Sequence, residues 1–533
     1  MENTHPIPKR ELQISLRNTT IAGAVGIFFF MIVQNGPIPL MLEKLGAGGI
    51  VIGLTATLFQ LGMLAQIPAA FFAERLAGRK LFWTTTTIAA RLLMMIPGIH
   101  LLLFPHHQST NIWLTVAAIG FFSFLAQTSM PSWHSWMADL VPESMRASFW
   151  SRRQGIVLAA AAASVALTGW FLDLFPETAI SGFGWLLVFA SAMGVLDIVI
   201  HWRVAEPPPI PPNRTLSVAK RILQPLKNRD FRHFTFAMCI WFFAVGLFAP
   251  FLNVYLKSTF GVTYTHISTI QLTGMFSSVV ASFIGGRLID RMGLRTYGLA
   301  MVVAVPFFSI LWFFLDGNAT GMLPVLGTVP QPVMMLCINS LIGSGVYAAV
   351  GMLQLNLLSA LAPSEGRTMA MAVHWSLIGL LSASGPVAGG WIKDFVTAHP
   401  IDFHLYAGTR FSYFHVLLIL HGLLTWFAML PFLFRIQKKD GEWPLKQAVA
   451  DIFILTPLRT VRNAYSFNLA LSSVAVNTVK GTASATGKIA AKAAKDTGTI
   501  AIRAVKDTVE SAKRAGKESV EKAKQKQEKK MPR

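Results

Sequence analysis

The chain has little charge for its length. Of its 533 residues, 13% are charged and 53% are hydrophobic. A soluble domain of average composition carries about 25% charged residues. This shortage excludes an ordinary soluble protein and indicates a chain for which lipid is the main solvent.

Cysteines and catalytic motifs are also scarce. The two cysteines, Cys239 and Cys337, lie in hydrophobic stretches, where a free thiol behaves as a small apolar side chain. They support neither a disulfide framework nor a metal site. No nucleotide-binding P-loop and no nucleophile motif stands out. We therefore expect no cofactor, no bound metal and no enzymatic activity.

Acidic residues are few, with 25 Asp and Glu against 46 Lys and Arg, which gives a net charge of +21. Such an excess is compatible with nucleic-acid binding, but the basic residues here gather in alternate loops between hydrophobic stretches. That distribution follows the positive-inside rule. We expect no nucleic-acid partner, and a multi-pass protein of the cell (inner) membrane with both termini in the cytoplasm.

Long hydrophobic runs are what the sequence has in abundance. A membrane helix needs about 20 apolar residues to cross about 30 Å of hydrocarbon. The first run is too long for a signal peptide and has no clear cleavage site, so we expect it to remain. The sequence predicts twelve spans, near 19–41, 49–73, 81–104, 112–138, 153–174, 182–202, 234–256, 266–289, 296–316, 333–361, 368–396 and 411–434.

Two loop motifs repeat along the chain. The segment Pro142–Ala147, after the fourth span, recurs as Pro363–Thr368 after the tenth, 221 residues later. The segment Glu74–Lys80, after the second span, has a counterpart in Asp290–Arg295 after the eighth, at an offset of about 215. A parallel duplication of a six-span unit predicts two helix bundles that face each other across a central cavity, as in transporters.

The stretch from Gly286 to Arg295 resembles the cytoplasmic loop signature of the major facilitator superfamily of transporters, of bacterial type, with no subfamily assigned. The resemblance implies an all-α membrane protein with two six-helix bundles. The expected parts are a cytoplasmic N-terminus (1–18), a first bundle (19–203), a Pro-rich linker (204–232), a second bundle (233–434) and a basic amphipathic tail (435–533).

In that family, the two repeated loops imply a conformational latch. A carboxylate beside arginines at a helix end can make a charge-assisted hydrogen bond in only one of two bundle arrangements. The first copy departs from the pattern, because Glu74 replaces Asp and Ala70 replaces Gly. The alternative is that the arginines only orient the chain. The latch residues are Glu74, Arg75, Gly78 and Arg79, and Gly286, Asp290, Arg291, Gly293 and Arg295.

Polar residues inside the spans are candidates for a substrate cavity. Arg91 lies ten residues into the third span, about 15 Å deep, where an ionisable group faces a cavity or a partner. It either binds an anionic or carbonyl-bearing solute or pairs within the bundle, for example with Asp197. Amides likewise either line a pathway or join helices. The further candidates are Gln127, Trp133, His134, Gln354, Asn356 and His374.

The function expected from these patterns is transport of a small solute by alternating access, by a chain acting as a monomer. The spans expected to line the cavity lack an interior carboxylate, so proton coupling by the usual acid is not indicated. Eleven-residue repeats near 495–520 predict a helical tail that binds anionic lipid, or one that is only solvated. The alternatives are a transporter-like sensor or scaffold with the tail as output module, and the handling of lipids or lipid-linked precursors, which needs a laterally open groove.

Overall fold

The structure is a computed structural model that describes residues 7–34, 36–73, 78–208, 218–323, 327–362, 367–405, 409–438 and 440–455. The chain divides into two units, residues 1–445 and 446–533. Helix α19 (Leu445–Ala450) begins at the boundary and is followed by a π-helical turn (Asp451–Leu455). The eleven-residue repeats of the tail lie outside the described residues.

The first half of the chain folds into a bundle of long helices. The first span is divided into α1 and α2 near Gly36-Pro37, because proline cannot donate the helical hydrogen bond. The second span is divided by a 3₁₀ turn, Met63–Ala65. The helices are α1 (Lys9–Val33), α2 (Ile38–Lys44), α3 (Gly49–Gly62), α4 (Gln66–Ala73), α5 (Arg79–Leu103), α6 (Gln108–Leu140), α7 (Arg146–Asp173) and α8 (Ser181–His201).

The second half repeats this plan. Its fifth and sixth spans are each interrupted, the sixth by a π-helical turn (Leu424–Met429). Strands β1 (Thr320–Leu323) and β2 (Gly327–Pro330) pair antiparallel, with Thr320 opposite Pro330, in the loop before α14. The helices are α10 (Arg229–Phe248), α11 (Leu252–Phe260), α12 (Tyr264–Met292), α13 (Leu294–Ile310), α14 (Gln331–Leu361), α15 (Arg367–Ser382), α16 (Ser384–Ala398), α17 (Tyr413–Leu423) and α18 (Leu430–Phe434).

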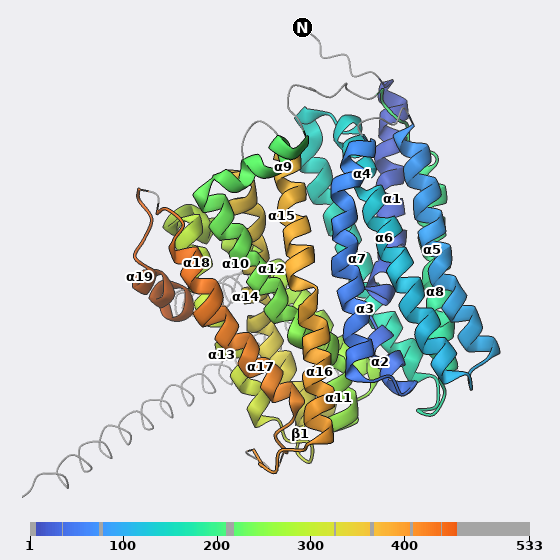
Figure 1. Ribbon diagram of the computed structural model, residues 1–533, viewed down its shortest axis with the longest axis vertical. Coiled ribbons are helices and arrows are strands. Elements are labelled where there is room, and N and C mark those ends of the chain that lie inside the picture. Colours follow the sequence, from blue (N-terminus) through green and yellow to red (C-terminus); the bar gives the residue numbers. More distant parts are fainter. Residues whose placement is uncertain are drawn as a thin grey trace, which may run out of the picture. The chain divides into compact units, whose positions relative to one another are not determined.

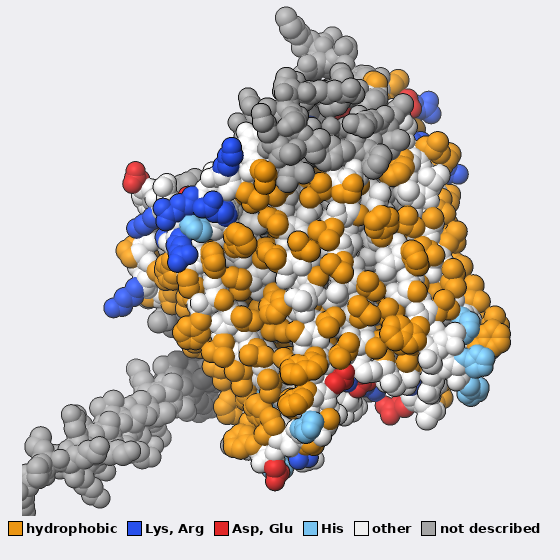
Figure 2. Space-filling model, in the orientation of Figure 1, with side chains coloured by type: hydrophobic (Ala, Val, Ile, Leu, Met, Phe, Trp, Pro, Cys, Tyr) orange, Lys and Arg blue, Asp and Glu red, His pale blue; other side chains and the backbone are white. Residues whose placement is uncertain are grey.

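The twelve predicted spans are confirmed: the described part of the chain contains twelve helical segments long and apolar enough to cross a membrane. Their outer faces expose large apolar side chains, for example Phe283 at 75% and Phe427 at 72%. Figure 2 shows hydrophobic side chains over the middle of one face of the first unit, with charged side chains near its edges. Contiguous apolar surface of this extent requires hydrocarbon around it.

The structure differs from the sequence prediction at two boundaries. Helix α1 begins at Lys9, ten residues before the predicted first span, and the predicted linker contains helix α9 (Val218–Lys227). Helix α10 begins at Arg229, where the Asn228 side chain caps it by accepting from the backbone nitrogens of residues 230 and 231. Hydropathy marks only the part of a helix in hydrocarbon, whereas polar residues extend these helices beyond it.

The two bundles contact each other most extensively along two helix pairs, α3 with α16 and α7 with α12, and less extensively where α15 meets α3 and α4 and where α11 meets α2 (Figure 1). The end of the first unit at which α1 begins and α18 ends carries most of the arginine-rich loops, and we call it the basic end. The end at which α2 and the β1–β2 hairpin lie is the opposite end (Figure 1).

Candidate functional site

The first of the two loop motifs is anchored inside its own bundle. Arg79 is 3% exposed, and its guanidinium donates to Asp139 at 2.6 Å, to Ser135 at 2.8 Å and to the carbonyl oxygen of Pro207 at 3.0 Å. Gly78 is the residue immediately before α5 and makes no side-chain hydrogen bond there. These bonds join α5, α6 and the start of the linker. Glu74 and Arg75 lie outside the described residues.

The second loop motif contacts the segment that follows the last span. Arg295 donates to the carbonyl oxygen of Phe434 at 2.9 Å, and the Arg291 guanidinium lies 4.5 Å from the Trp443 ring. Gly293 has a φ of 88°, which favours glycine. Asp290, four residues beyond Gly286 on α12, is exposed. In this conformation the described contacts of the motif lie within the second half.

Arg91 lies in the core of the first bundle. It is 3% exposed, and its guanidinium carbon is 4.0 Å from the ring of Phe29 and 4.5 Å from that of Phe30. Among the described residues, Nε and Nη1 have no hydrogen-bond partner. Asp197 instead accepts from His201 at 2.9 Å. Arg91 projects from α5 towards α1 and α8, and its cation–π contacts with the two phenylalanines of α1 stabilise the packing of these helices.

Two candidates of the second bundle meet in a buried network. His374 lies with its Nδ1 3.0 Å from the Thr235 hydroxyl and its Nε2 3.3 Å from the Gln354 amide. The Phe234 ring stacks on the imidazole at 5.1 Å. Because His374 is fully buried and Gln354 is 5% exposed, this network joins α10, α14 and α15 rather than lining an open space.

The other polar candidates lie apart. Gln127 accepts from Gln66 at 2.7 Å and thereby joins α6 to α4. Asn356 is exposed and donates to a carbonyl oxygen of its own helix. His134 is exposed and Trp133 half-buried, with the two rings 5.2 Å apart.

Close packing of glycines joins the bundles along α3 and α16. A Cβ on Gly53 would collide with the backbone oxygen of Pro386, and one on Gly390 would collide with that of Gly49. Further along, Thr57 donates to the carbonyl oxygen of Ala383 at 2.5 Å. Small residues therefore let the two backbones approach each other, as helices in membranes commonly do.

A carboxylate also crosses this interface at the opposite end. Asp394, at the end of α16, accepts from the backbone nitrogens of Gly49 at 2.6 Å and of Ile50 at 3.0 Å. These are the first two residues of α3, so the carboxylate caps a helix N-terminus and faces its positive dipole. Beside it, Lys393 pairs with Glu43 at 2.9 Å.

The second helix pair has the same arrangement. Asp173, at the end of α7, accepts from the backbone nitrogens of Tyr264 at 2.9 Å and of Thr265 at 2.7 Å, at the start of α12. Nearby, Lys257 pairs with Glu177 at 2.8 Å. The hydrogen bond from Lys257 lowers the pKa of the exposed Glu177 carboxyl below its ordinary value.

The two carboxylate caps are related by the internal repeat. Asp394 follows Asp173 by 221 residues, and Tyr264 follows Gly49 by 215, which are the offsets of the loop motifs. Each bundle therefore caps a helix of the other. The sequence prediction missed both aspartates, although their shared offset and their position at the ends of two spans were visible in the sequence.

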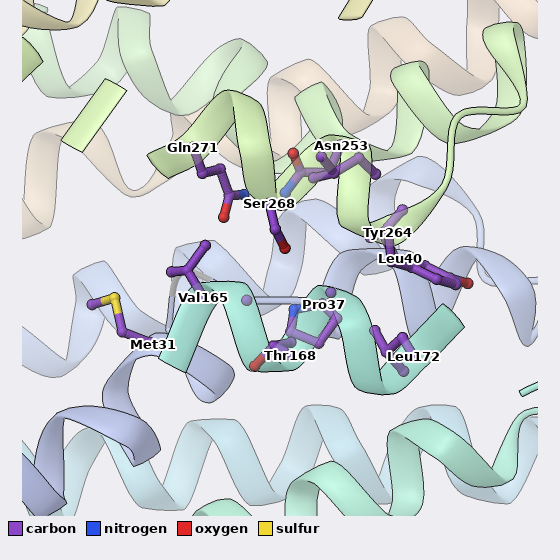
Figure 3. A pocket seen from close by; sticks show the side chains of 13 residues that line it. Met31, Pro37, Leu40, Val165, Thr168, Leu172, Asn253, Tyr264, Ser268 and Gln271 are labelled. Atoms are coloured by element: carbon purple, nitrogen blue, oxygen red, sulfur yellow. The ribbon is translucent and has the colours of Figure 1, made fainter. Parts of the chain in front are cut away.

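A small cavity lies between the bundles, beside the pair α7 and α12. Figure 3 shows Asn253 and Ser268 on one wall and Val165 and Thr168 on the facing wall. Its volume is about 30 Å³. None of the described side chains that line it carries a charge, and the Asn253 Oδ1 has no hydrogen-bond partner among the described residues.

The fold and this pseudo-symmetric interface are those of a membrane transporter built from two halves. Residues 20–386 match the Major Facilitator Superfamily, and the chain belongs to that family. It is a solute transporter with twelve membrane helices. No curated protein sequence matches the chain.

Solved structures share the fold at low sequence identity. A single-residue mutant of the nucleoside transporter NupG has a TM-score of 0.62 and 11% identity, over 80% of this chain and 100% of that chain. A bacterial homologue of the human lysosomal transporter Spinster, in an inward-facing and occupied conformation, has a TM-score of 0.55 and 16% identity. The match covers 85% of this chain and 98% of the homologue. A D-xylose–proton symporter has a TM-score of 0.54 and 14% identity, over 78% of this chain and 97% of the symporter.

Proposed function

We propose that this protein carries a small solute across the cytoplasmic membrane by alternating access, as a secondary active or facilitative transporter without catalytic activity. The observation that carries the proposal is the pair of caps from Asp394 and Asp173. Each joins one bundle to the other through contacts that exist only while the opposite end is closed. Two equivalent contacts about one pseudo-symmetry axis suit a rocking motion of rigid bundles.

The proposed orientation places the basic end in the cytoplasm, since Lys and Arg are enriched in cytoplasmic loops. The caps then close the pathway on the outer side. Solute reaches the protein from the cytoplasm in this conformation and from outside after the caps separate. The same motion would bring the Asp290 loop towards the first bundle, where its carboxylate would act as the latch that favours the alternative conformation.

Distances between spin labels on the two bundles test this motion. With both native cysteines replaced by serine, one label pair at Ser109 and Asn318 reports on the opposite end, and one at Ser144 and Lys438 reports on the basic end. All four positions are exposed. The measurement is double electron–electron resonance on the full chain in nanodiscs.

Replacing both Asp173 and Asp394 by Asn should lengthen the distance at the opposite end and shorten it at the basic end. A control pair within the first bundle, at Ser109 and Glu177, should keep its distance. Lengthening at one end without shortening at the other would contradict alternating access, and so would a change in the control pair, because the bundles would then not move as rigid bodies.

A further inference from the structure

A cluster of basic side chains lies at the basic end of the second bundle, where the last span meets the start of α10. Arg229, Arg232 and His233 lie on one face of the first two turns of α10, because they are three and four residues apart. Arg435 follows directly after α18. All three guanidinium groups are close enough to the His233 imidazole to act on its charge. Basic residues from the beginning and the end of the second half of the chain therefore converge here.

The positive charge of this cluster is poorly balanced. A helix N-terminus already carries a partial positive charge, so arginines in the first turn of α10 add to it. Asp230 is the acidic residue of that turn, and its carboxylate accepts from the backbone nitrogen of Gln437 at 3.3 Å. Arg232 donates to the carbonyl oxygen of Leu226 at 3.3 Å. None of the three arginines forms an ion pair with a residue that the structure describes, so three guanidinium groups face one carboxylate.

Other arginines at the basic end bond to the protein itself. Arg79 is buried and donates to α6 and to the linker, and Arg295 donates to the last residue of α18. Arg229, Arg232 and Arg435 are instead exposed. The positive-inside rule requires basic residues in these loops, but it does not require them to converge from two distant segments. Their convergence, with donors directed outwards, is the arrangement of an anion-binding site.

An aromatic surface open to lipid lies directly beside the arginines. Phe236 continues the same face of α10 one turn further into the span, and it is 38% exposed. Its ring lies 6.1 Å from that of Phe432 in α18, and the Arg435 guanidinium carbon lies 5.6 Å from the Phe432 ring. Figure 2 shows Lys and Arg side chains gathered at the basic end, beside α18, directly above hydrophobic surface. Guanidinium groups at headgroup level with aromatic rings below them match the order of phosphate and acyl chain in a phospholipid.

We propose that the three arginines bind the phosphate of one anionic phospholipid in the leaflet at the basic end, with an acyl chain against Phe236 and Phe432. The planar guanidinium fork suits phosphate oxygens. A headgroup without a cation of its own, such as phosphoglycerol, offsets the excess positive charge, whereas a choline group would add to it. The lipid ties the end of the last span to the start of α10. The site lies away from the two helix pairs that join the bundles, so it does not depend on the proposed transport cycle.

Native mass spectrometry of the full chain in detergent, with lipid titrated in, measures the affinity of each lipid-binding step. The probe is dioleoylphosphatidylglycerol, and dioleoylphosphatidylcholine is the zwitterionic comparison. We expect the first phosphatidylglycerol to bind at least about fivefold more tightly than phosphatidylcholine. Arg229→Gln combined with Arg435→Gln should weaken phosphatidylglycerol binding at least about tenfold, because each arginine near an anionic head contributes ~fivefold, and should leave phosphatidylcholine binding unchanged.

The matched control combines Arg17→Gln with Arg203→Gln, which removes the same charge from two exposed arginines of the first half and should leave both affinities unchanged. An excess of inorganic phosphate should not displace the bound phosphatidylglycerol, because phosphate lacks the acyl chain. Equal affinities for the two lipids would overturn the proposal, and so would equal losses in the two double variants, since only the overall charge would then act. Displacement by inorganic phosphate would make this a site for a free anion and overturn the assignment to a lipid.

Discussion

Removal of one carboxylate cap should open the opposite end by a predictable amount. Asp394→Asn keeps one oxygen acceptor for the start of α3 but loses the negative charge and the second acceptor. A charge at a helix terminus contributes ~0.3–1 kcal/mol when exposed and up to ~2 when partly buried. Asp394 is half-buried, so we expect a loss of about 1 kcal/mol in the closed conformation, which is about fivefold in the ratio of closed to open molecules.

The equivalent Asp173 is exposed, so Asp173→Asn should have a smaller effect, about twofold, from a loss of ~0.5 kcal/mol. The spin-label pair at Ser109 and Asn318 measures both populations. Glu177→Gln is the matched control, because it removes a carboxylate at the same end whose side chain is 82% exposed and whose ion pair contributes little. Equal effects of all three variants, or none from Asp394→Asn, would refute the reasoning.

Four further results are expected. Gly390→Ala places a methyl group against a backbone oxygen of α3 and should favour the open conformation roughly tenfold in the same spin-label assay, whereas Gly155→Ala, which has open space around its Cβ, should change nothing. Arg91→Ala leaves a cavity and removes the cation–π contacts with Phe29 and Phe30, so unfolding in detergent should become easier by ~3 kcal/mol. Unchanged stability with lost solute affinity would instead return Arg91 to the substrate site. Asp290→Asn should slow exchange between the two conformations more than it weakens solute binding, and unchanged solute flux in vesicles would remove the latch. Because the pKa of Glu177 is lowered, its ion pair with Lys257 is intact above the ordinary glutamate pKa and is lost only as pH falls through the lowered value. Since this exposed pair contributes little, the opposite end should keep its distance distribution from about pH 8 to 5, and a change of the distances within that range would contradict this assignment.

The sequence by itself determined the membrane class, the twelve spans and the parallel repeat. These properties follow from hydrophobic length and from loop motifs that recur at fixed offsets, and both are local features of the chain. The basic loops likewise predict an orientation, because the positive-inside rule depends on where Lys and Arg lie along the chain. None of these features depends on which helices touch.

The tertiary structure alone decided which polar residues face each other. Arg91, Gln354 and His374 were predicted either to line a cavity or to join helices, because hydropathy locates depth but not the face of a helix. In this conformation they are buried in the packing of their own bundles, and their part in solute binding stays a prediction. Asp173 and Asp394 looked like ordinary span ends, yet each caps a helix of the other bundle. Contacts between helices some 90 and 345 residues apart depend on how the bundles pack, and no local pattern encodes that packing.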